Sequence, residues 1–316
     1  MIEWLWASTP AFDLWKFLLT IFLVVNFKNL PLVFHYRIFR PIIQSAFGEK
    51  RRHQFISIKN GDKTLPLVFL PCITTTYTPM LEADYNLHKS NSTYFTDLDA
   101  SRSHLLSYLC YSGISVVDKE LTTEGKKGML AAIIGSVSTS FKKEIRILQQ
   151  YEVWSRILTW DKKWLYIVTH FVQKGSVKHA CFVTNMLPGG HICGKCGGAN
   201  GASAVRPVVF ATSVSKYVFK KGRFTVAPER LLRASGLFGD SDKLGGEDSA
   251  KSSGAKDGTA IGEVVENERA KGFKYAEAWD ELESLHAEFA GENEIASCIP
   301  AIGHFDDVAG YGFSFS

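Results

Sequence analysis

The sharpest change in the pattern of apolar and polar positions lies between a predicted strand and a predicted helix. Residues 74–81 are β-branched, aromatic and apolar, which predicts a strand. Apolar residues then recur at helical spacing, which predicts a helix over about 91–110. Ser90 or Asn91 is expected to cap this helix, because either side chain can accept a hydrogen bond from a free backbone N–H. The charged positions of the helix are expected mostly away from its apolar face: Asp97, Asp99, Arg102 and His104.

Further apolar, β-branched segments follow this helix and predict an antiparallel sheet. The strand candidates are residues 131–141, 145–158, 164–172, 178–186 and 208–219. The links at 160–163 and 174–176 have hairpin length, so the strands that they join are expected to be antiparallel. One helix followed by a meander of strands predicts an α+β domain over residues 64–236, with a short helix at its end.

Residues 1–63 form an apolar leader and a polar connection. Residues 17–25 are almost entirely apolar, but the run is shorter than the roughly 20 residues that cross a bilayer as a helix. A second apolar and aromatic segment, 30–43, contains Arg37 and Arg40, a mixture typical of a membrane surface. We therefore expect an N-terminal apolar helix associated with the cytosolic face of a membrane, the endoplasmic reticulum or another endomembrane. A helix buried against the core is the other interpretation.

The C-terminal part differs in composition. Residues 237–262 are rich in Gly, Ser, Asp and Lys with few apolar anchors, which predicts a disordered linker. Within residues 263–316, a helix is expected over about 263–289. Its apolar stripe must pack on the domain or on a partner subunit.

Composition narrows the function classes. A net charge of +4 over 316 residues, without interleaved basic and aromatic residues, argues against a nucleic-acid binder. The 6 cysteines are scattered, which indicates a reducing compartment rather than a disulfide framework. His191, Cys193 and Cys196 supply only three nearby donors, and a structural zinc site needs four. No metal and no cofactor are expected.

Asp84 is the strongest candidate for chemistry, because it lies in the loop that leads into the predicted helix. Free N–H groups at a helix N-terminus can polarise a carbonyl, and an adjacent carboxylate can activate water against it. A simple turn or capping aspartate is the other interpretation of Asp84. No G-x-S-x-G pattern is present, so a Ser–His–Asp hydrolase is not supported.

A longer pattern runs through this loop and the helix: Asp84, His88, Asn91, Tyr94, Asp99 and Arg102. It resembles the first strand-loop-helix of hot-dog-fold acyl-CoA thioesterases, with the hydroxybenzoyl-CoA thioesterase-like group as the most similar type. The chain departs from that pattern at Leu87, where the group often has Gly, and at Ser90, where it often has Asn. The apolar leader resembles that of eukaryotic thioesterase-like proteins, and the linker and C-terminal helix resemble those of fungal members.

The resemblance implies a hot-dog fold, in which an antiparallel sheet wraps a long central helix, and a homodimer that hydrolyses acyl-CoA or acyl-carrier thioesters. It implies that Asp84 is the base or nucleophile and that the backbone N–H of Asn91 polarises the thioester carbonyl. His88 is a candidate for assisting Asp84, while Tyr94 and Asp99 are candidates for substrate binding. Two other functions stay open: a non-catalytic hot-dog protein that binds acyl thioesters or lipids at a membrane, and a dehydratase with His88 as base.

Overall fold

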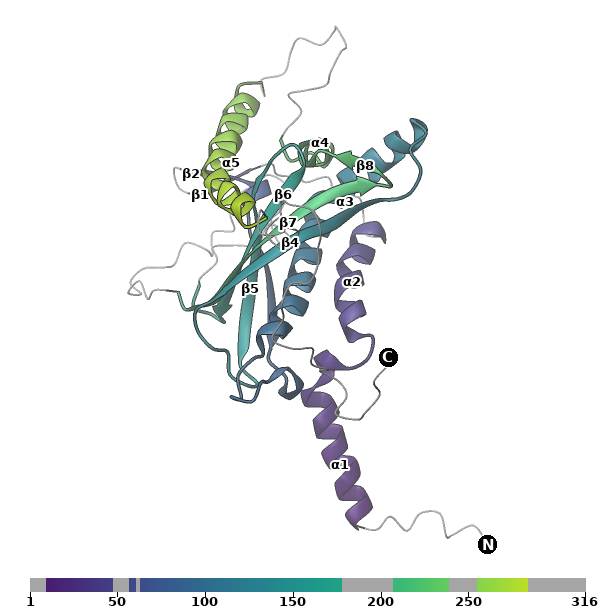
Figure 1. Cartoon of the computed structure of the whole chain (residues 1–316), viewed down its shortest axis with the longest axis vertical. Coiled ribbons are helices and arrows are strands. Elements are labelled where there is room, and N and C mark those ends of the chain that lie inside the picture. The colour runs from purple at the N-terminus through teal and green to yellow at the C-terminus, as the bar shows by residue number, and fades with distance from the viewer. Residues whose placement is uncertain (1–9, 48–56, 61–62, 178–206, 239–254, 284–316) are drawn as a thin grey trace, which may run out of the picture. The chain divides into compact units, whose positions relative to one another are not determined.

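The computed structural model describes residues 10–47, 57–60, 63–177, 207–238 and 255–283 (Figure 1). Its main sheet is six-stranded and antiparallel throughout, with the order β3-β5-β6-β7-β4 and with β8 paired to β7. The strands of this sheet are β3 (Cys72–Tyr77), β4 (Leu130–Phe141), β5 (Gln150–Trp160), β6 (Trp164–Gln173), β7 (Val209–Lys221) and β8 (Phe224–Val226). A separate two-stranded sheet pairs β1 (Ser57–Asn60) with β2 (Lys63–Pro66).

The long helix α3 (Tyr94–Thr123) packs against this sheet and supplies much of the core. It continues well past the expected end at residue 110, because Val117 and Leu121 extend its apolar stripe and are fully buried. The long helix and the antiparallel sheet confirm the expected α+β class and hot-dog fold.

The sheet differs from the expected meander in one respect. Strand β4 pairs with β7 at one edge of the sheet, not with β5, which follows it in sequence. Strand β5 also begins at Gln150 rather than at residue 145, because residues 142–149 form an irregular link in which Leu148 has a φ of 60°. The expected strand at 178–186 lies outside the described residues.

Two charged residues of α3 are buried, contrary to the expectation that they face outward. The Asp97 and Arg102 residues are each 1% exposed. Burying a charge is costly unless it is paired, and both side chains do have partners. Arg102 donates to Ser215 on β7 and to Asp99 one turn earlier on α3.

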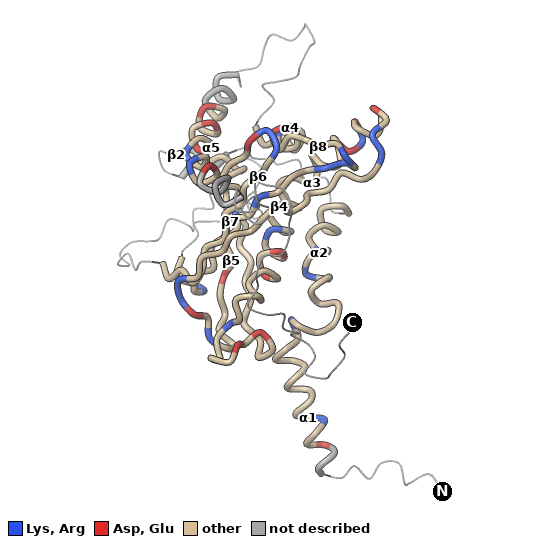
Figure 2. The backbone as a smooth tube through the Cα atoms, in the orientation of Figure 1, with Lys and Arg blue, Asp and Glu red and all other residues tan. Residues whose placement is uncertain are grey.

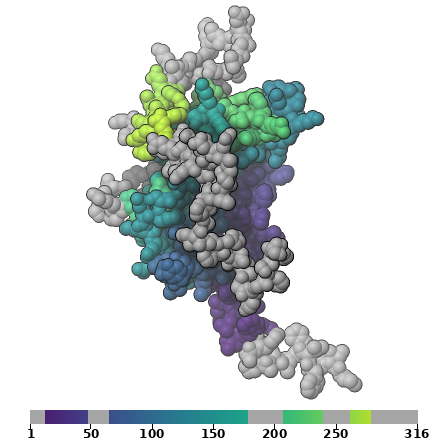
Figure 3. Space-filling view, viewed as in Figure 1, coloured from purple at the N-terminus to yellow at the C-terminus, as the bar shows by residue number. Residues whose placement is uncertain are grey.

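Two helices precede the sheet: α1 (Pro10–Val25) and α2 (Val33–Phe47). Helix α1 carries almost no charge (Figure 2), and its large apolar side chains are exposed around the helix, including Leu14, Phe17 and Val24. Part of its surface, in purple, is visible in the space-filling view of Figure 3. None of the helices within the described residues combines the length and the apolar character needed to cross a membrane.

The expected C-terminal helices are present with shifted bounds: α4 (Pro228–Ala234) and α5 (Ala255–Glu283). Helix α5 begins inside the segment expected to be a linker, and residues 239–254 of that segment lie outside the described residues. Up to Phe273, α5 belongs to the same compact unit as the sheet, and Thr159 donates to the carbonyl of Arg269 at 2.8 Å. The chain from Lys274 on forms a second unit, so the docking of the expected apolar stripe stays a prediction.

Candidate active site

The candidate catalytic loop, residues 83–93, is a closed turn between β3 and α3. The Asp84 N–H donates to the His88 carbonyl at 2.8 Å, and Ala83 and Lys89 form an antiparallel bridge. The turn places Leu87 at a φ of 62°, in the left-handed region that favours glycine. Glycine, which the hot-dog pattern that this loop resembles often has at this position, would adopt this conformation without strain, and Leu87 adopts it at a small cost.

The carboxylate of Asp84 holds this turn through one oxygen only. Its Oδ1 accepts hydrogen bonds from the backbone N–H groups of Asn86 at 2.9 Å and His88 at 3.1 Å. No hydrogen bond within the described residues takes the other oxygen, Oδ2. Asp84 is therefore both a turn aspartate and a carboxylate with one oxygen available for a reacting group.

Asn91 begins a short 3-10 helix, Asn91–Thr93, that leads directly into α3. The first N–H groups of a helix have no acceptor inside it, and within the described residues none is supplied to the Asn91 N–H. Ser90 occupies the N-cap position of the 3-10 helix, and Thr93 occupies that of α3. The expected hydrogen bond from a capping side chain is absent, because no side-chain oxygen caps either helix. The Asn91 N–H can therefore donate to a ligand, whereas the Thr93 N–H already donates to the Ser90 carbonyl at 3.0 Å.

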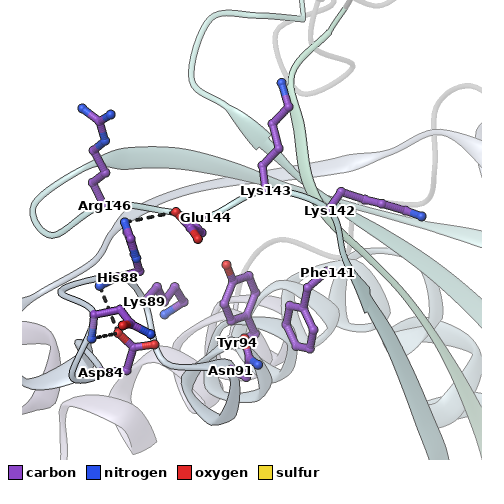
Figure 4. Close-up of a pocket in the computed structure, with 11 residues that line it drawn as sticks. Asp84, His88, Lys89, Asn91, Tyr94, Phe141, Lys142, Lys143, Glu144 and Arg146 are labelled. Atoms are coloured by element: carbon purple, nitrogen blue, oxygen red, sulfur yellow. Dashed lines mark hydrogen bonds and ion pairs between the residues drawn. The ribbon is translucent and has the colours of Figure 1, made fainter.

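Asp84, His88, Asn91 and Tyr94 line one pocket of about 640 Å³ (Figure 4). The whole lining consists of Asp84, Asn86, His88, Lys89, Asn91, Tyr94, Phe141, Lys142, Lys143, Glu144 and Arg146. Tyr94 and Phe141 form an apolar wall, with ring centroids 5.0 Å apart in an edge-to-face arrangement. Burial raises the pKa of Tyr94, with Asp97 and Glu144 adding to the shift, so its hydroxyl stays protonated and can donate.

Two predicted site residues have partners of their own. The His88 Nε2 lies 3.1 Å from the carboxylate of Glu144, so the imidazole is directed across the pocket rather than toward the Asp84 carboxylate. Asp99 is not part of the pocket lining and pairs with the buried Arg102. The structure thus groups four of the five predicted residues and separates Asp99 from them.

Cations line the pocket on the side of the link between β4 and β5. Lys142, Lys143 and Arg146 are exposed and belong to the lining. Lys216 on β7 is fully buried beside the Trp164 ring and does not belong to this lining. A negatively charged part of a substrate would therefore meet the link at residues 142–146.

A buried ionic cluster lies directly beneath the catalytic loop. Lys89 contacts the carboxylates of Glu82 and Asp97, and both of these side chains are almost completely buried. The leader completes the cluster: Lys28 lies 2.9 Å from Glu82 and 2.8 Å from Asp97, and Arg37 lies 2.7 Å from Asp97. The leader is thus tied to the loop by paired, desolvated charges.

The protonation states of this cluster follow from its geometry. Burial by itself would raise the pKa of Asp97, but Lys28, Lys89 and Arg37 outweigh burial and hold that pKa well below its usual value. Burial also lowers the pKa of Lys28 against the opposing effect of Asp97, and it raises the pKa of Tyr151, whose hydroxyl donates to Asp97. Asp97 is therefore a permanent anion at neutral pH.

Sequence reasoning missed the members of this cluster: Lys28, Arg37, Glu82, Lys89, Asp97 and Tyr151. Charged residues at such loop and helix positions are usually exposed to solvent, so nothing in the sequence predicts that Glu82, Lys89 and Asp97 are buried. Their partners Lys28 and Arg37 are more than 50 residues away in sequence. In the leader, Arg37 is interpreted from the sequence as part of a membrane-surface segment rather than as a partner of Asp97. Glu144 and Arg146 were also missed, while the His191, Cys193 and Cys196 loop lies outside the described residues.

Comparison with known proteins gives the family. Residues 78–191 match the model of the thioesterase-like superfamily. The probable thioesterase atnL of Emericella nidulans is 36% identical over 279 residues, which cover 84% of this chain and 84% of that protein. The chain belongs to the thioesterase-like superfamily.

Two more relatives of this thioesterase are similar over most of their length. The thioesterase poxG of Penicillium oxalicum is 30% identical over 296 residues, covering 92% of this chain and 90% of poxG. The thioesterase lcsJ of Purpureocillium lilacinum is 31% identical over 310 residues, covering 84% of this chain and 89% of lcsJ. These fungal relatives confirm the resemblance and identify a thioester hydrolase, and the likeness to poxG covers 92% of the chain.

Proposed function

We propose that this enzyme hydrolyses acyl thioesters with Asp84 as the general base and the Asn91 N–H as the donor to the thioester oxygen. One observation carries the proposal: a carboxylate oxygen of Asp84 and an uncommitted N–H at the start of the helix both belong to one pocket. A base of this kind contributes about 10²–10⁴-fold to the rate, and one oxyanion donor about 3–4 kcal/mol.

The reaction follows from those two groups. Asp84 takes a proton from a water molecule, whose oxygen forms a bond to the thioester carbon. The carbonyl oxygen becomes an oxyanion that the Asn91 N–H stabilises, together with the positive end of the helix dipole. The C–S bond then breaks, the thiolate leaves with the proton held by Asp84, and a carboxylic acid remains. Direct attack by Asp84 would instead give an acyl anhydride on the enzyme.

The substrate is an acyl group on coenzyme A or on an acyl carrier. Lys142, Lys143 and Arg146 offer charge to the phosphates of the carrier arm, and Tyr94 and Phe141 offer an apolar wall to the acyl group. The enzyme acts as a homodimer in which a second copy covers the outer edge of β4. Within the part of the chain that the structure describes, this edge has no strand partner, and β4 exposes Ile133 and Ile134.

Association with the cytosolic face of a membrane accounts for the leader. A helix that is apolar all round is normally buried on all sides, yet α1 is exposed at Trp15, Phe22 and Val24. Its 16 residues span about 24 Å, less than the roughly 30 Å of a bilayer core, so it lies in the interface rather than across it. Exposed Phe39 and Ile43 extend the apolar surface along α2, next to Arg40.

Hydrolysis of a panel of short- and long-chain acyl-CoA thioesters tests this proposal. Wild type is expected to release free thiol from at least one chain length, and Asp84→Asn to lose that activity while its circular dichroism spectrum stays unchanged. Wild-type protein that binds acyl-CoA but hydrolyses none of the panel above the uncatalysed rate would instead be a non-catalytic binder.

A further inference from the structure

A second cavity, separate from the active-site pocket, lies between α2, β3 and α3 and measures about 180 Å³. Its walls include Arg37 and Arg40 from α2 and His104 from α3. It is open to solvent, because Tyr36, Arg40 and Thr75 in its lining are exposed. None of the residues predicted to be catalytic or substrate-binding lines it.

The charges around this cavity do not balance. Arg37 is committed to Asp97, which also lines the cavity, whereas no carboxylate in the described part of the chain pairs with Arg40. The guanidinium of Arg40 lies 6.0 Å from the ring of Tyr36, where the aromatic face holds it at the cavity wall. Asp97 and Glu82 are both neutralised by the buried ionic cluster, so Arg40 is a surplus positive charge.

The neutral groups of the cavity are hydrogen-bond donors as well. Thr74, Thr75 and Thr76 of β3 line it; the Thr74 hydroxyl already donates to the Val153 carbonyl at 3.4 Å, which leaves the hydroxyls of Thr75 and Thr76 as donors. Burial lowers the pKa of His104, and Arg40 and Arg37 lower it further, so the imidazole is neutral at pH 7 and a nearby anion would restore its affinity for a proton. Arginine, threonine hydroxyls and a histidine together match a tetrahedral oxyanion.

We propose that this cavity binds the phosphate monoester headgroup of a membrane lipid. The position of the cavity favours a phosphate that belongs to a lipid rather than a free phosphate. Phe39 and Ile43 on α2 are each 52% exposed and lie within a turn of Arg40. Their side chains would enter the acyl region of the membrane while the Arg40 guanidinium reaches the phosphate. The assignment of the phosphate to a lipid rests on the membrane association proposed above. The binding of a phosphate by this cavity does not depend on it.

The test is sedimentation of the full-length protein with vesicles of phosphatidylcholine alone, and with phosphatidic acid or phosphatidylserine added to equal surface charge. Wild type is expected to bind phosphatidic acid vesicles more tightly than both others. Arg40→Gln is expected to weaken that binding about tenfold or more, the usual value of a charge-assisted hydrogen bond. The matched control is Lys119→Gln, which removes the same charge from α3, about 22 Å along that helix from the cavity residue His104 and beyond the screening length. It should change binding less than twofold.

Three results would overturn the inference: equal binding to phosphatidic acid and phosphatidylserine vesicles, wild-type binding by Arg40→Gln, or an equal loss in Lys119→Gln. Glycerol 3-phosphate added as a soluble competitor separates the two sources. Saturable binding of this compound that depends on Arg40, with no tighter binding to vesicles, would keep the phosphate chemistry and refute the lipid source. Hydrolysis of soluble acyl-CoA by wild type is a separate measurement. Wild-type protein that hydrolyses acyl-CoA but does not bind phosphatidic acid vesicles would therefore refute this inference alone.

Discussion

Replacing Asp97 by Asn tests whether the buried ionic cluster ties the leader to the catalytic loop. The side chain of Asp97 is 0% exposed and meets Lys28 at 2.8 Å, Arg37 at 2.7 Å and Lys89 at 3.0 Å. Asn keeps the shape of the side chain but removes its charge, which leaves three cations against the single carboxylate of Glu82.

The expected magnitude follows from these exposures. Breaking a buried ion pair by removing one partner costs about 3–5 kcal/mol of unfolding free energy. The lower end applies here, because the side chain of Arg37 is 21% exposed and can turn toward water. We expect Asp97→Asn to lose about 3 kcal/mol, measured as a lower midpoint of urea unfolding with an unchanged slope.

The dependence of stability on pH adds a second readout. The pKa of Asp97 is lower in the folded chain than its ordinary value of 3.8, so its charge contributes stability that is fully present above that value. This contribution is lost as the pH falls below 3.8 toward the folded pKa, and Asp97→Asn should lack that part of the acid dependence. The control Glu120→Gln removes an exposed carboxylate of the same helix, paired with Arg230, and should cost about 1 kcal/mol or less. Equal losses in both variants, or a loss below about 1 kcal/mol in Asp97→Asn, would refute the reasoning.

Three further changes have defined outcomes. Leu87→Gly should not lower the unfolding free energy and should raise it by up to about 1 kcal/mol, because it relieves a left-handed residue whose side chain is exposed, whereas Leu87→Val should lower it in the same urea titration. Gly113→Ala should lower the free energy of unfolding in urea by about 3 kcal/mol, since the new Cβ would lie 2.2 Å from a backbone oxygen. In the control Gly262→Ala the new Cβ meets nothing within 4 Å, so this change should be neutral or stabilising. The double variant Lys142→Gln, Lys143→Gln should raise KM for acyl-CoA about tenfold, because it removes two cations from the pocket lining. KM for an acyl-pantetheine, which lacks the phosphates, should not change. An equal rise in KM for both substrates would contradict a phosphate contact.

The main elements of the fold could be predicted from the sequence because their signals are local. Alternation and helical spacing are carried by neighbouring residues, so strands such as 164–172 and the start of α3 were found close to their observed bounds. The placement of β4 beside β7 was not found, because strand order depends on packing between distant segments. The end of α3 is different, because Val117 and Leu121 keep the four-residue spacing of Leu105 and Leu109 and only Gly113, a poor helix former, interrupts that local pattern.

The candidate site shows the same division. Asp84, His88, Asn91 and Tyr94 lie within one short stretch, and the structure brings them to one pocket. Charges that are paired across the fold look like solvated surface residues in the sequence, and so Asp97 was placed on the wrong face. The pairing of His88 with Glu144 likewise needs the β4–β5 link, which no local pattern positions.

The turnover number of Asp84→Asn, compared with that of Asp161→Asn, tests the central claim most directly. Asp161 is a turn aspartate of the same design, since its Oδ1 accepts the backbone N–H groups of Lys163 and Trp164 at 2.6 Å each. Asn preserves such a turn at both positions but cannot act as a base. The account predicts that kcat for an acyl-CoA substrate falls about 10²–10⁴-fold in Asp84→Asn and stays within about twofold of wild type in Asp161→Asn. A wild-type kcat in Asp84→Asn, or equal losses in the two variants, would contradict it.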